Sequence, residues 1–225
     1  MEKVVVLNLK MNLSYDEVMQ YIESIKSFSS SLIVCPSFVY IPYFISAGYV
    51  VGAQDTFYDD FGSFTGEVSP RQLKSLGTEY VIVGHSERRR LFHESNYVIN
   101  KKIKRGIANG LKVIFCVGEE EKDKDNYREI LFKQITEGLD GVSGDVFISY
   151  EPVWAIGSAN PIDKSRLLEV VNYIKSLRPD CKVLYGGSVN SESACLLNMD
   201  ELSGFLVGSA SLDYDEVKKI IEVVK

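Results

Sequence analysis

The segment Ser149-Tyr-Glu-Pro-Val-Trp-Ala-Ile-Gly-Ser158 overlaps the end of a short apolar run that starts at Val146. Such a run is typical of a buried strand. Pro152 disfavours a helical backbone for the residue before it, so Glu151 is expected at the carboxyl end of that strand. The loop beyond it has an apolar tip and reaches a second proline, Pro161, which is typical of a hinged lid. An ordinary strand-to-helix connection with an incidental glutamate explains this segment equally well.

The same order, an apolar run followed by a stretch with helical periodicity, occurs on both sides of this segment. After the first run, apolar residues at 18, 21, 22 and 25 occupy one face of a helix. Ser69 and Ser95 are suited to cap two later helices. The expected strands are residues 4–7, 32–34, 50–51, 80–83, 113–117, 146–150, 183–185 and 205–207, and helical stretches follow each of them.

Eight strand-helix alternations favour the α/β class. The strands are apolar along their whole length, which indicates a parallel sheet covered by helices. Eight similar units close into a (β/α)8 TIM barrel, whereas a doubly wound open sheet, the competing architecture, gives no reason for that number. We find no interdomain linker and expect a single domain over residues 1–225, somewhat shorter than the roughly 250 residues typical of this fold.

Composition argues against several classes of partner and cofactor. The chain has 25 basic and 31 acidic residues and a net charge of -6, so no overall field would attract nucleic acid or an anionic membrane. Four scattered cysteines and only two histidines argue against a disulfide framework or a metal site. We find neither a signal peptide nor an apolar run near the roughly 18 residues of a membrane span, and we expect a cytoplasmic protein without metal or cofactor.

Polar residues collect where the expected strands end. In a parallel barrel the carboxyl ends of all strands meet at one rim, so residues far apart in the chain converge there. The groups are Asn8-Leu-Lys10, Gly84-His-Ser-Glu-Arg-Arg89, Cys116-Val-Gly-Glu119, Glu151, Gly186-Gly-Ser188 and Gly208-Ser209. An active site is therefore expected at this rim.

These groups resemble sequence blocks of the triosephosphate isomerase family and occur in the family's order. The matching blocks are Asn8-Leu-Lys-Met-Asn12, Gly66-Glu67, Val83-Gly-His-Ser-Glu-Arg-Arg89, Cys116-Val-Gly-Glu119, Tyr150-Glu-Pro-Val-Trp-Ala-Ile-Gly157, Tyr185-Gly-Gly-Ser-Val189 and Gly204-Phe-Leu-Val-Gly208. The resemblance implies a cofactor-independent aldose-ketose isomerase of glycolysis and gluconeogenesis. Such an enzyme interconverts dihydroxyacetone phosphate and D-glyceraldehyde 3-phosphate through an enediolate.

The resemblance also implies roles for five rim residues. Glu151 matches the base that removes a proton next to a carbonyl, and His85 matches the neutral donor to the substrate oxygens. Lys10 and Asn8 match the groups beside the developing charge, and Glu87 matches the partner that positions Lys10. The family is itself a standard example of tuned proton affinity in an active site. Taken singly, His85 could be a core histidine, Lys10 a solvated side chain and Glu87 a first-turn helix carboxylate.

Further residues match the family's lid and phosphate site. A lid would exclude solvent from the base, and a phosphate dianion needs several N–H donors. The lid residues are Pro152, Val153, Trp154, Ala155 and Ile156. The phosphate-binding residues are Gly157, Ser188, Gly208 and Ser209. Each of these glycines, taken alone, would be an ordinary turn residue.

The connection over residues 54–65 is long and aromatic, and by itself is typical of a self-packed surface loop. In the family this loop inserts into a neighbouring subunit beside the active-site lysine. Thr65 is therefore the expected partner contact, and a homodimer is the expected assembly.

The chain departs from the family pattern in four places. Leu9 stands where tryptophan is usual. Asp55, where asparagine is usual, is expected to add a negative charge near the subunit interface. Ser209 replaces a glycine, which would strain the backbone if a positive φ were required there. Residues 159–161, Ala-Asn-Pro, replace the usual second hinge, which leaves the lid kinetics open.

Two other functions stay open. A non-catalytic triosephosphate-binding barrel would keep the phosphate residues but has no need of Lys10, His85 and Glu151 together. Another phosphate-binding barrel enzyme, such as a sugar-phosphate epimerase, would need different strand-end acids or metal ligands. The isomerase therefore fits these residues best.

Overall fold

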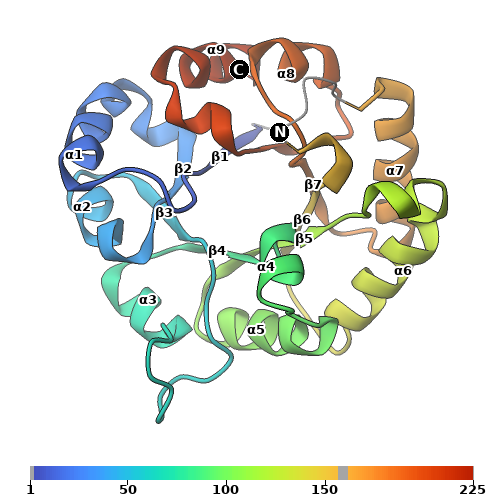
Figure 1. The fold of residues 1–225 in the computed structure, drawn as a ribbon, viewed down its shortest axis with the longest axis horizontal. Helices are drawn as coiled ribbons and strands as arrows, with labels where there is room; N and C mark the ends of the chain where they lie inside the picture. The colour runs from blue at the N-terminus through green and yellow to red at the C-terminus, as the bar shows by residue number, and fades with distance from the viewer. Residues whose placement is uncertain (1–2, 157–161, 225) are drawn as a thin grey trace.

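The computed structural model describes residues 3–156 and 162–224, and within them eight strands form a closed barrel (Figure 1). Neighbouring strands pair in parallel, and β1 closes the ring by pairing with β8. The strands are β1 (Val4–Asn8), β2 (Leu32–Cys35), β3 (Val50–Ala53), β4 (Tyr80–Val83), β5 (Lys112–Val117), β6 (Val146–Tyr150), β7 (Lys182–Tyr185) and β8 (Gly204–Val207). The predicted (β/α)8 barrel is confirmed.

Helices surround the barrel in chain order (Figure 1). They are α1 (Tyr15–Ser24), α2 (Ile41–Ser46), α3 (Pro70–Leu76), α4 (Ser86–Leu91), α5 (Asn96–Ala108), α6 (Tyr127–Gly138), α7 (Lys164–Leu177), α8 (Ser191–Leu197) and α9 (Tyr214–Val224). The 3-10 turns are η1 (Lys26–Ser31), η2 (Phe38–Tyr40), η3 (Glu121–Asn126), η4 (Val153–Ala155) and η5 (Ser209–Leu212). Two predicted caps form, because Ser69 and Ser95 accept hydrogen bonds from the backbone N–H groups of Gln72 and Val98.

The strands bury side chains on both of their faces. Val6 of β1 points into the barrel interior, whereas its neighbours Val5 and Leu7 pack between the strands and the surrounding helices. The interior cluster consists of Val6, Ile33, Cys35, Tyr80, Ile82, Ile114, Cys116, Phe147, Leu184 and Leu206. This two-sided burial explains why the strands lack a polar face.

Helix α6 begins at Tyr127, because the preceding segment Glu121–Asn126 forms the 3-10 turn η3. This segment reads Glu-Lys-Asp-Lys-Asp-Asn and has no apolar residue to bury against the barrel, so it cannot extend the amphipathic face of α6.

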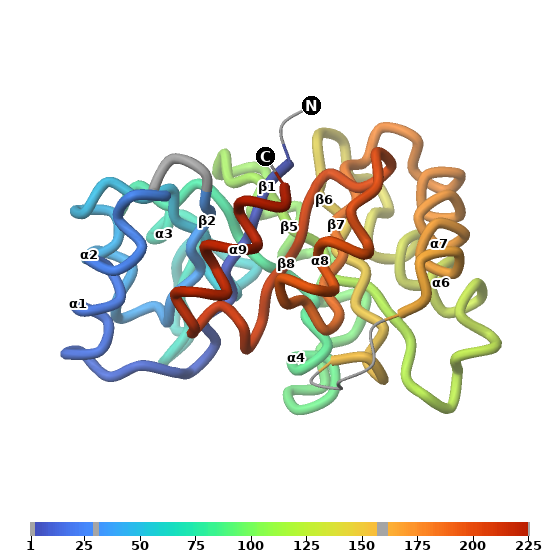
Figure 2. Tube along the Cα trace, turned by 90° about the horizontal axis from the view of Figure 1, so that it is seen from above, coloured from blue at the N-terminus to red at the C-terminus, as the bar shows by residue number. Residues whose placement is uncertain are grey.

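Both termini lie on one side of the barrel, and α4 lies on the other (Figure 2). The strands run from the side of the termini to the side of α4, so the loops that follow the strands lie on the α4 side. Among the described residues no helix is both long and apolar enough to cross a membrane. The connection between β3 and α3 extends away from the ring (Figure 1), and its aromatic side chains pack on one another, with the rings of Phe57 and Phe64 centred 4.6 Å apart.

Candidate active site

A cavity of about 160 Å³ opens at the carboxyl ends of the strands. Its walls come from the ends of β1, β4, β6, β7 and β8. The lining residues are Asn8, Lys10, His85, Glu151, Ile156, Gly186, Gly187, Ser188, Val189, Leu206, Gly208 and Ser209. Eight of the residues predicted from the sequence are among them, which brings the expected base, proton donor, cation and phosphate donors to one enclosed space.

The backbone of Lys10 has an unusual conformation, with φ at 51°. Three hydrogen bonds fix it. The N–H of Lys10 donates to Asn8 Oδ1 (3.1 Å), and its carbonyl accepts from Gln54 Nε2 (2.8 Å) and Ser37 Oγ (3.1 Å). A positive φ outside glycine costs roughly 1 kcal/mol or more, and it persists only where the surroundings impose it. Gln54 and Ser37 are therefore site residues that the sequence patterns did not reveal.

The ammonium group of Lys10 is held by Glu87 of α4, with 2.6 Å between Nζ and Oε1. Partial burial would raise the pKa of Glu87, but the hydrogen bond from Lys10 and the nearby charges of His85, Lys10 and Arg90 outweigh it and leave that pKa below its ordinary value. Glu87 is thus an anion paired with Lys10, which is the contact that the family resemblance implies.

His85 forms the N-cap of α4, and its ring orientation is defined by one bond. Nδ1 accepts a hydrogen bond from the backbone N–H of Glu87 at 3.2 Å. In a neutral ring the proton then lies on Nε2. Nε2 lies 3.7 Å from Glu151 Oε1, at the cavity. A neutral His85 is therefore oriented to donate a hydrogen bond into the space that a substrate would fill.

Glu151 is 1 % exposed and directly follows β6. Its Oε2 accepts a long hydrogen bond, 3.3 Å, from the backbone N–H of Ser86. Its Oε1 has no hydrogen-bond partner in the part of the chain that the structure describes. A carboxylate oxygen that no donor engages is accessible to a proton of a bound substrate, as the position of a general base requires.

Two glycines make room for Glu151. A methyl group at Gly186 would lie 2.9 Å from Glu151 Cγ and 2.5 Å from Ser149 Oγ. A methyl group at Gly118 would lie 1.9 Å from the Glu151 carbonyl oxygen. All three distances are below van der Waals contact, so a side chain at either position would displace Glu151 or its neighbour Ser149.

Gly186→Ala is expected to lower kcat by about tenfold or more, because small displacements of a reacting group are costly. The matched control is Gly106→Ala on α5, where a methyl group would meet its nearest neighbours at 3.5 Å. Steady-state kinetics on the two purified variants measures the difference. Wild-type turnover in Gly186→Ala would contradict the tight fit around Glu151.

The described part of the lid is anchored to the loop after β5. Trp154 Nε1 donates to Glu119 Oε1 (2.9 Å), and the N–H of Val153 donates to the Glu119 carbonyl (3.0 Å). Lys124 Nζ lies 3.8 Å from the centre of a Trp154 ring. Burial raises the pKa of Glu119, although its hydrogen bonds oppose the rise. Glu119 is a lid contact that sequence reasoning did not assign.

The candidate phosphate donors Ser188, Gly208 and Ser209 line the part of the cavity that follows β7 and β8. Gly208 is close to Lys10, since a methyl group there would lie 3.8 Å from Lys10 Cε. Ser209 begins η5, and it is not among the described non-glycine residues with positive φ, so serine in place of glycine does not strain the backbone. Gly157, the fourth predicted donor, lies outside the described residues.

Asp55, which stands where asparagine is usual in the family, belongs to a buried ion-pair network. It is buried, with both oxygens within 2.8 Å of Lys102 Nζ and one oxygen 2.8 Å from Arg88 Nε. Glu94 completes the network, 2.6 Å from Lys102 and 2.5 Å from Arg88. Arg88 is adjacent to Glu87 on α4, so the network also fixes the helix from which Glu87 binds Lys10.

The pH dependence of the unfolding free energy should reveal the raised pKa of Asp55 in this network. Burial raises the pKa of Asp55 to about 6 and Glu94 adds to the rise, while Lys102 and Arg88 oppose it. The folded state then holds the proton more tightly than the unfolded state, so this group's stabilisation is present at low pH and is lost as pH rises through about 6.

Asp55→Asn is therefore expected to flatten the dependence of the unfolding free energy on pH between about 4 and 7, by at most roughly 3 kcal/mol. Urea denaturation across that pH range measures it. The matched control is Asp145→Asn, which replaces an exposed loop aspartate. Equal slopes in Asp55→Asn and wild type would contradict the altered proton affinity of Asp55.

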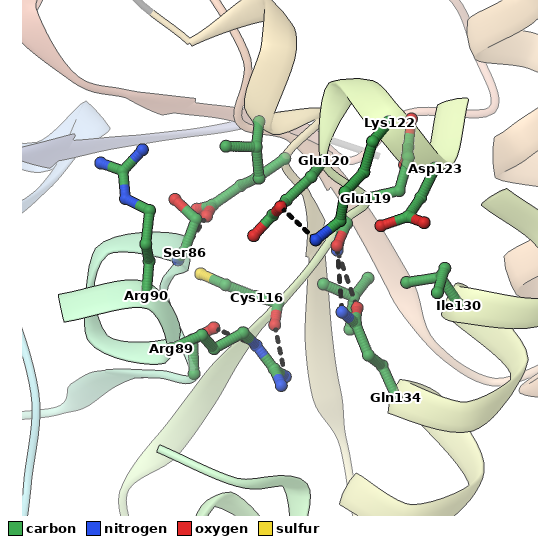
Figure 3. Close-up of a pocket in the computed structure, with 15 residues that line it drawn as sticks. Ser86, Arg89, Arg90, Cys116, Glu119, Glu120, Lys122, Asp123, Ile130 and Gln134 are labelled. Atoms are coloured by element: carbon green, nitrogen blue, oxygen red, sulfur yellow. Dashed lines mark hydrogen bonds and ion pairs between the residues drawn. The ribbon is translucent and has the colours of Figure 1, made fainter. Parts of the chain in front are cut away.

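A second cavity, of about 290 Å³, lies on the other side of Glu151, between α4 and η3 (Figure 3). It is lined in part by Ser86, Arg89, Cys116 and Glu119, and Glu151 belongs to the walls of both cavities. Across the described ranges no cluster of three or more His, Cys, Asp or Glu side chains is arranged to hold a metal ion.

Comparison with known proteins points to one family. The triosephosphate isomerase family profile matches residues 3–224. The triosephosphate isomerase of Aquifex aeolicus (strain VF5) is 37 % identical over 98 % of this chain and 99 % of its own length. Those of Thermodesulfovibrio yellowstonii and of Wolbachia sp. subsp. Brugia malayi are each 38 % identical, over 98 % and 100 % of this chain and 99 % of their own lengths. The chain belongs to the triosephosphate isomerase family.

Proposed function

We propose that Glu151, His85 and Lys10 carry out the reaction of the chain's family. As a family member the chain is a cofactor-independent isomerase that interconverts dihydroxyacetone phosphate and D-glyceraldehyde 3-phosphate, a step of glycolysis. One observation supports the assignment most strongly: the carboxylate of Glu151 and Nε2 of His85 lie 3.7 Å apart in a cavity that Lys10 also lines.

The assignment gives each proton a donor and an acceptor. Glu151 takes a proton from the carbon next to the substrate carbonyl, while Nε2–H of His85 donates a hydrogen bond to the carbonyl oxygen as negative charge develops on it. The ammonium of Lys10 stabilises that charge. His85 Nε2 is assigned to give its proton to that oxygen and to take the proton of the neighbouring hydroxyl in exchange, and Glu151 returns its proton to the neighbouring carbon. Asn8 uses Oδ1 for the Lys10 N–H, so its amide NH₂ is the group that faces the substrate.

The substrate phosphate is assigned to the wall that follows β7 and β8. Ser188, Gly208 and Ser209 lie beyond β7 and β8, where barrels of this kind bind phosphate. Gly157 is assigned as a fourth donor on its sequence match alone. Pro152, Val153, Trp154, Ala155 and Ile156 are assigned to the lid, and Ile156 at the cavity wall would exclude water from Glu151.

Activity and ligand binding together test this assignment. Wild-type protein is assayed on D-glyceraldehyde 3-phosphate, and binding of phosphoglycolate, a mimic of the enediolate, is measured in parallel. Turnover with tight phosphoglycolate binding is the expected result. Phosphoglycolate binding without turnover would favour the non-catalytic triosephosphate-binding barrel and overturn the catalytic roles.

The chain is further assigned as a homodimeric, single-domain, cytoplasmic enzyme whose partners are small triose phosphates rather than nucleic acid or membranes. Thr65 lies in the exposed β3–α3 loop, together with Phe61, which is 80 % exposed. Met11, which follows Lys10, is 94 % exposed. Apolar side chains this exposed favour burial against a second copy. Light scattering is expected to give a dimer mass, and a fully active monomer at high dilution would overturn it.

A further inference from the structure

We propose that Arg89 is a positioning residue for the isomerase reaction, because its guanidinium group locks the turn at residues 84–86 against the end of β5. That turn carries the Ser86 N–H group, which donates a hydrogen bond to Glu151, and His85, whose Nε2 lies 3.7 Å from the Glu151 carboxylate. The inference rests on the roles proposed above for His85 and Glu151.

The guanidinium group bridges three acceptors, and Figure 3 shows its bond to Cys116. Nε donates to the Gly84 carbonyl (2.8 Å), Nη2 donates to the Cys116 carbonyl (3.2 Å), and Nη1 donates to Asn96 Oδ1 (2.6 Å). Gly84 follows β4 and Cys116 lies in β5, so one side chain ties the ends of two neighbouring strands to the start of α5. All three acceptors are uncharged, and no ion pair of Arg89 with a carboxylate occurs within the described ranges.

The turn beneath Arg89 leaves little room for adjustment. Gly84 has φ at 75°, and a methyl group there would lie 3.2 Å from Arg89 Nη2 and 3.3 Å from the Cys116 carbonyl oxygen. The Gly84 carbonyl belongs to the peptide bond that leads into His85. If its donor were removed, that peptide could rotate, and both the His85 ring and the Ser86 N–H would move relative to Glu151.

The charge of Arg89 has an effect on the base as well. Burial lowers the pKa of Arg89 to about 10, and the charges of Cys116, Glu151 and Glu94 oppose that shift. The group therefore stays positive at neutral pH. No carboxylate pairs with it directly, and its charge attracts that of Glu151, which lines the same cavity.

The same cavity provides a direct test by chemical rescue. Arg89 and Glu151 both line the 290 Å³ cavity behind the active site, so truncation of Arg89 would enlarge a space that a small cation can enter (Figure 3). Free guanidinium has the shape and charge of the missing group. It is used at concentrations far below those that unfold proteins.

Arg89→Ala is expected to lower kcat about 30- to 100-fold with KM changed less than about threefold, because the reacting groups and not the phosphate donors move. Arg89→Lys keeps the charge but loses the fork of donors, so it should retain part of the activity. Guanidinium chloride, but not sodium chloride at equal ionic strength, should restore Arg89→Ala by about fivefold or more. The matched control is Arg90→Ala, an exposed neighbour on α4 that lines the same cavity.

A second readout does not depend on turnover. The chain has two histidines, and His93 is exposed and serves as an internal reference for His85 in the ¹⁵N side-chain spectrum. The His85 signals should shift in Arg89→Ala and in Arg89→Lys, but not in Arg90→Ala. Unchanged His85 signals together with kcat within twofold of wild type would overturn the proposal. A wild-type protein without turnover would instead overturn the proposed function, and the His85 spectrum would still decide the role of Arg89.

Discussion

Glu151→Gln is expected to lower kcat by about 10³- to 10⁴-fold, the range that general acid-base catalysis contributes. The substituted amide has nearly the shape of the carboxylate but cannot accept a proton from carbon. KM should change little, because three of the four assigned phosphate donors, Ser188, Gly208 and Ser209, follow β7 and β8 rather than β6. Kinetics on D-glyceraldehyde 3-phosphate, with exchange of substrate hydrogen against deuterium in the solvent, measures the loss at the proton-transfer step.

The fold should tolerate this change. Glu151 is 1 % exposed, and one of its oxygens has no partner among the described residues, so a neutral amide removes a buried charge without breaking an ion pair. Thermal unfolding of the variant should therefore occur at or above the wild-type temperature. Glu120→Gln, which changes an exposed carboxylate on the loop after β5, should remain fully active. More than a tenth of wild-type turnover in Glu151→Gln would show that another group is the base.

The second large effect is expected at Lys10. Lys10→Met keeps most of the side-chain length and removes the charge. It should lower kcat/KM by about 10²- to 10³-fold, since one preorganised charge at the reacting oxygen contributes about that much. Both kcat and KM should be affected, because Lys10 lies near the expected phosphate site as well as near the base. Phosphoglycolate affinity should fall in parallel.

Two further variants separate the charge of Lys10 from its backbone conformation. Because φ is 51°, Lys10→Gly should be more stable than Lys10→Ala by roughly 1 kcal/mol, although both are inactive. Lys26→Met removes an exposed lysine that pairs with Glu23 and should leave kinetics unchanged. Near-wild-type kcat/KM in Lys10→Met would contradict an electrostatic role.

The fold could be predicted because its main determinants are local. Each strand is buried on two faces, so its apolar run stands out in the sequence, and Ser69 and Ser95 mark helix starts through hydrogen bonds to residues three positions away. Strand ends were underestimated by one or two residues, as at Asn8 and Ala53, where polar or small side chains continue the pairing.

Much of the site could not be predicted because it depends on contacts between distant segments. Gln54 reaches the carbonyl of Lys10 only once β1 and β3 are set two places apart in the ring. The ion pairs of Asp55 could not be predicted, because its partners Lys102 and Arg88 lie on two helices that no local pattern brings together. The residues matched to the family do gather at one cavity, and their catalytic roles stay predictions for the variants above.

The residues assigned to catalysis are divided between the two halves of the barrel. Asn8, Lys10, His85 and Glu87 belong to the segment that ends with α5, and Glu151 and the phosphate donors belong to the segment that begins with β5. Neither half alone holds a complete reaction centre. A chain cut at the turn Asn109-Gly110 would thus give two inactive fragments. Their mixture would regain isomerase activity only when β4 pairs with β5 and β8 pairs with β1. Enzyme turnover would then measure the reassembly of the fragments directly.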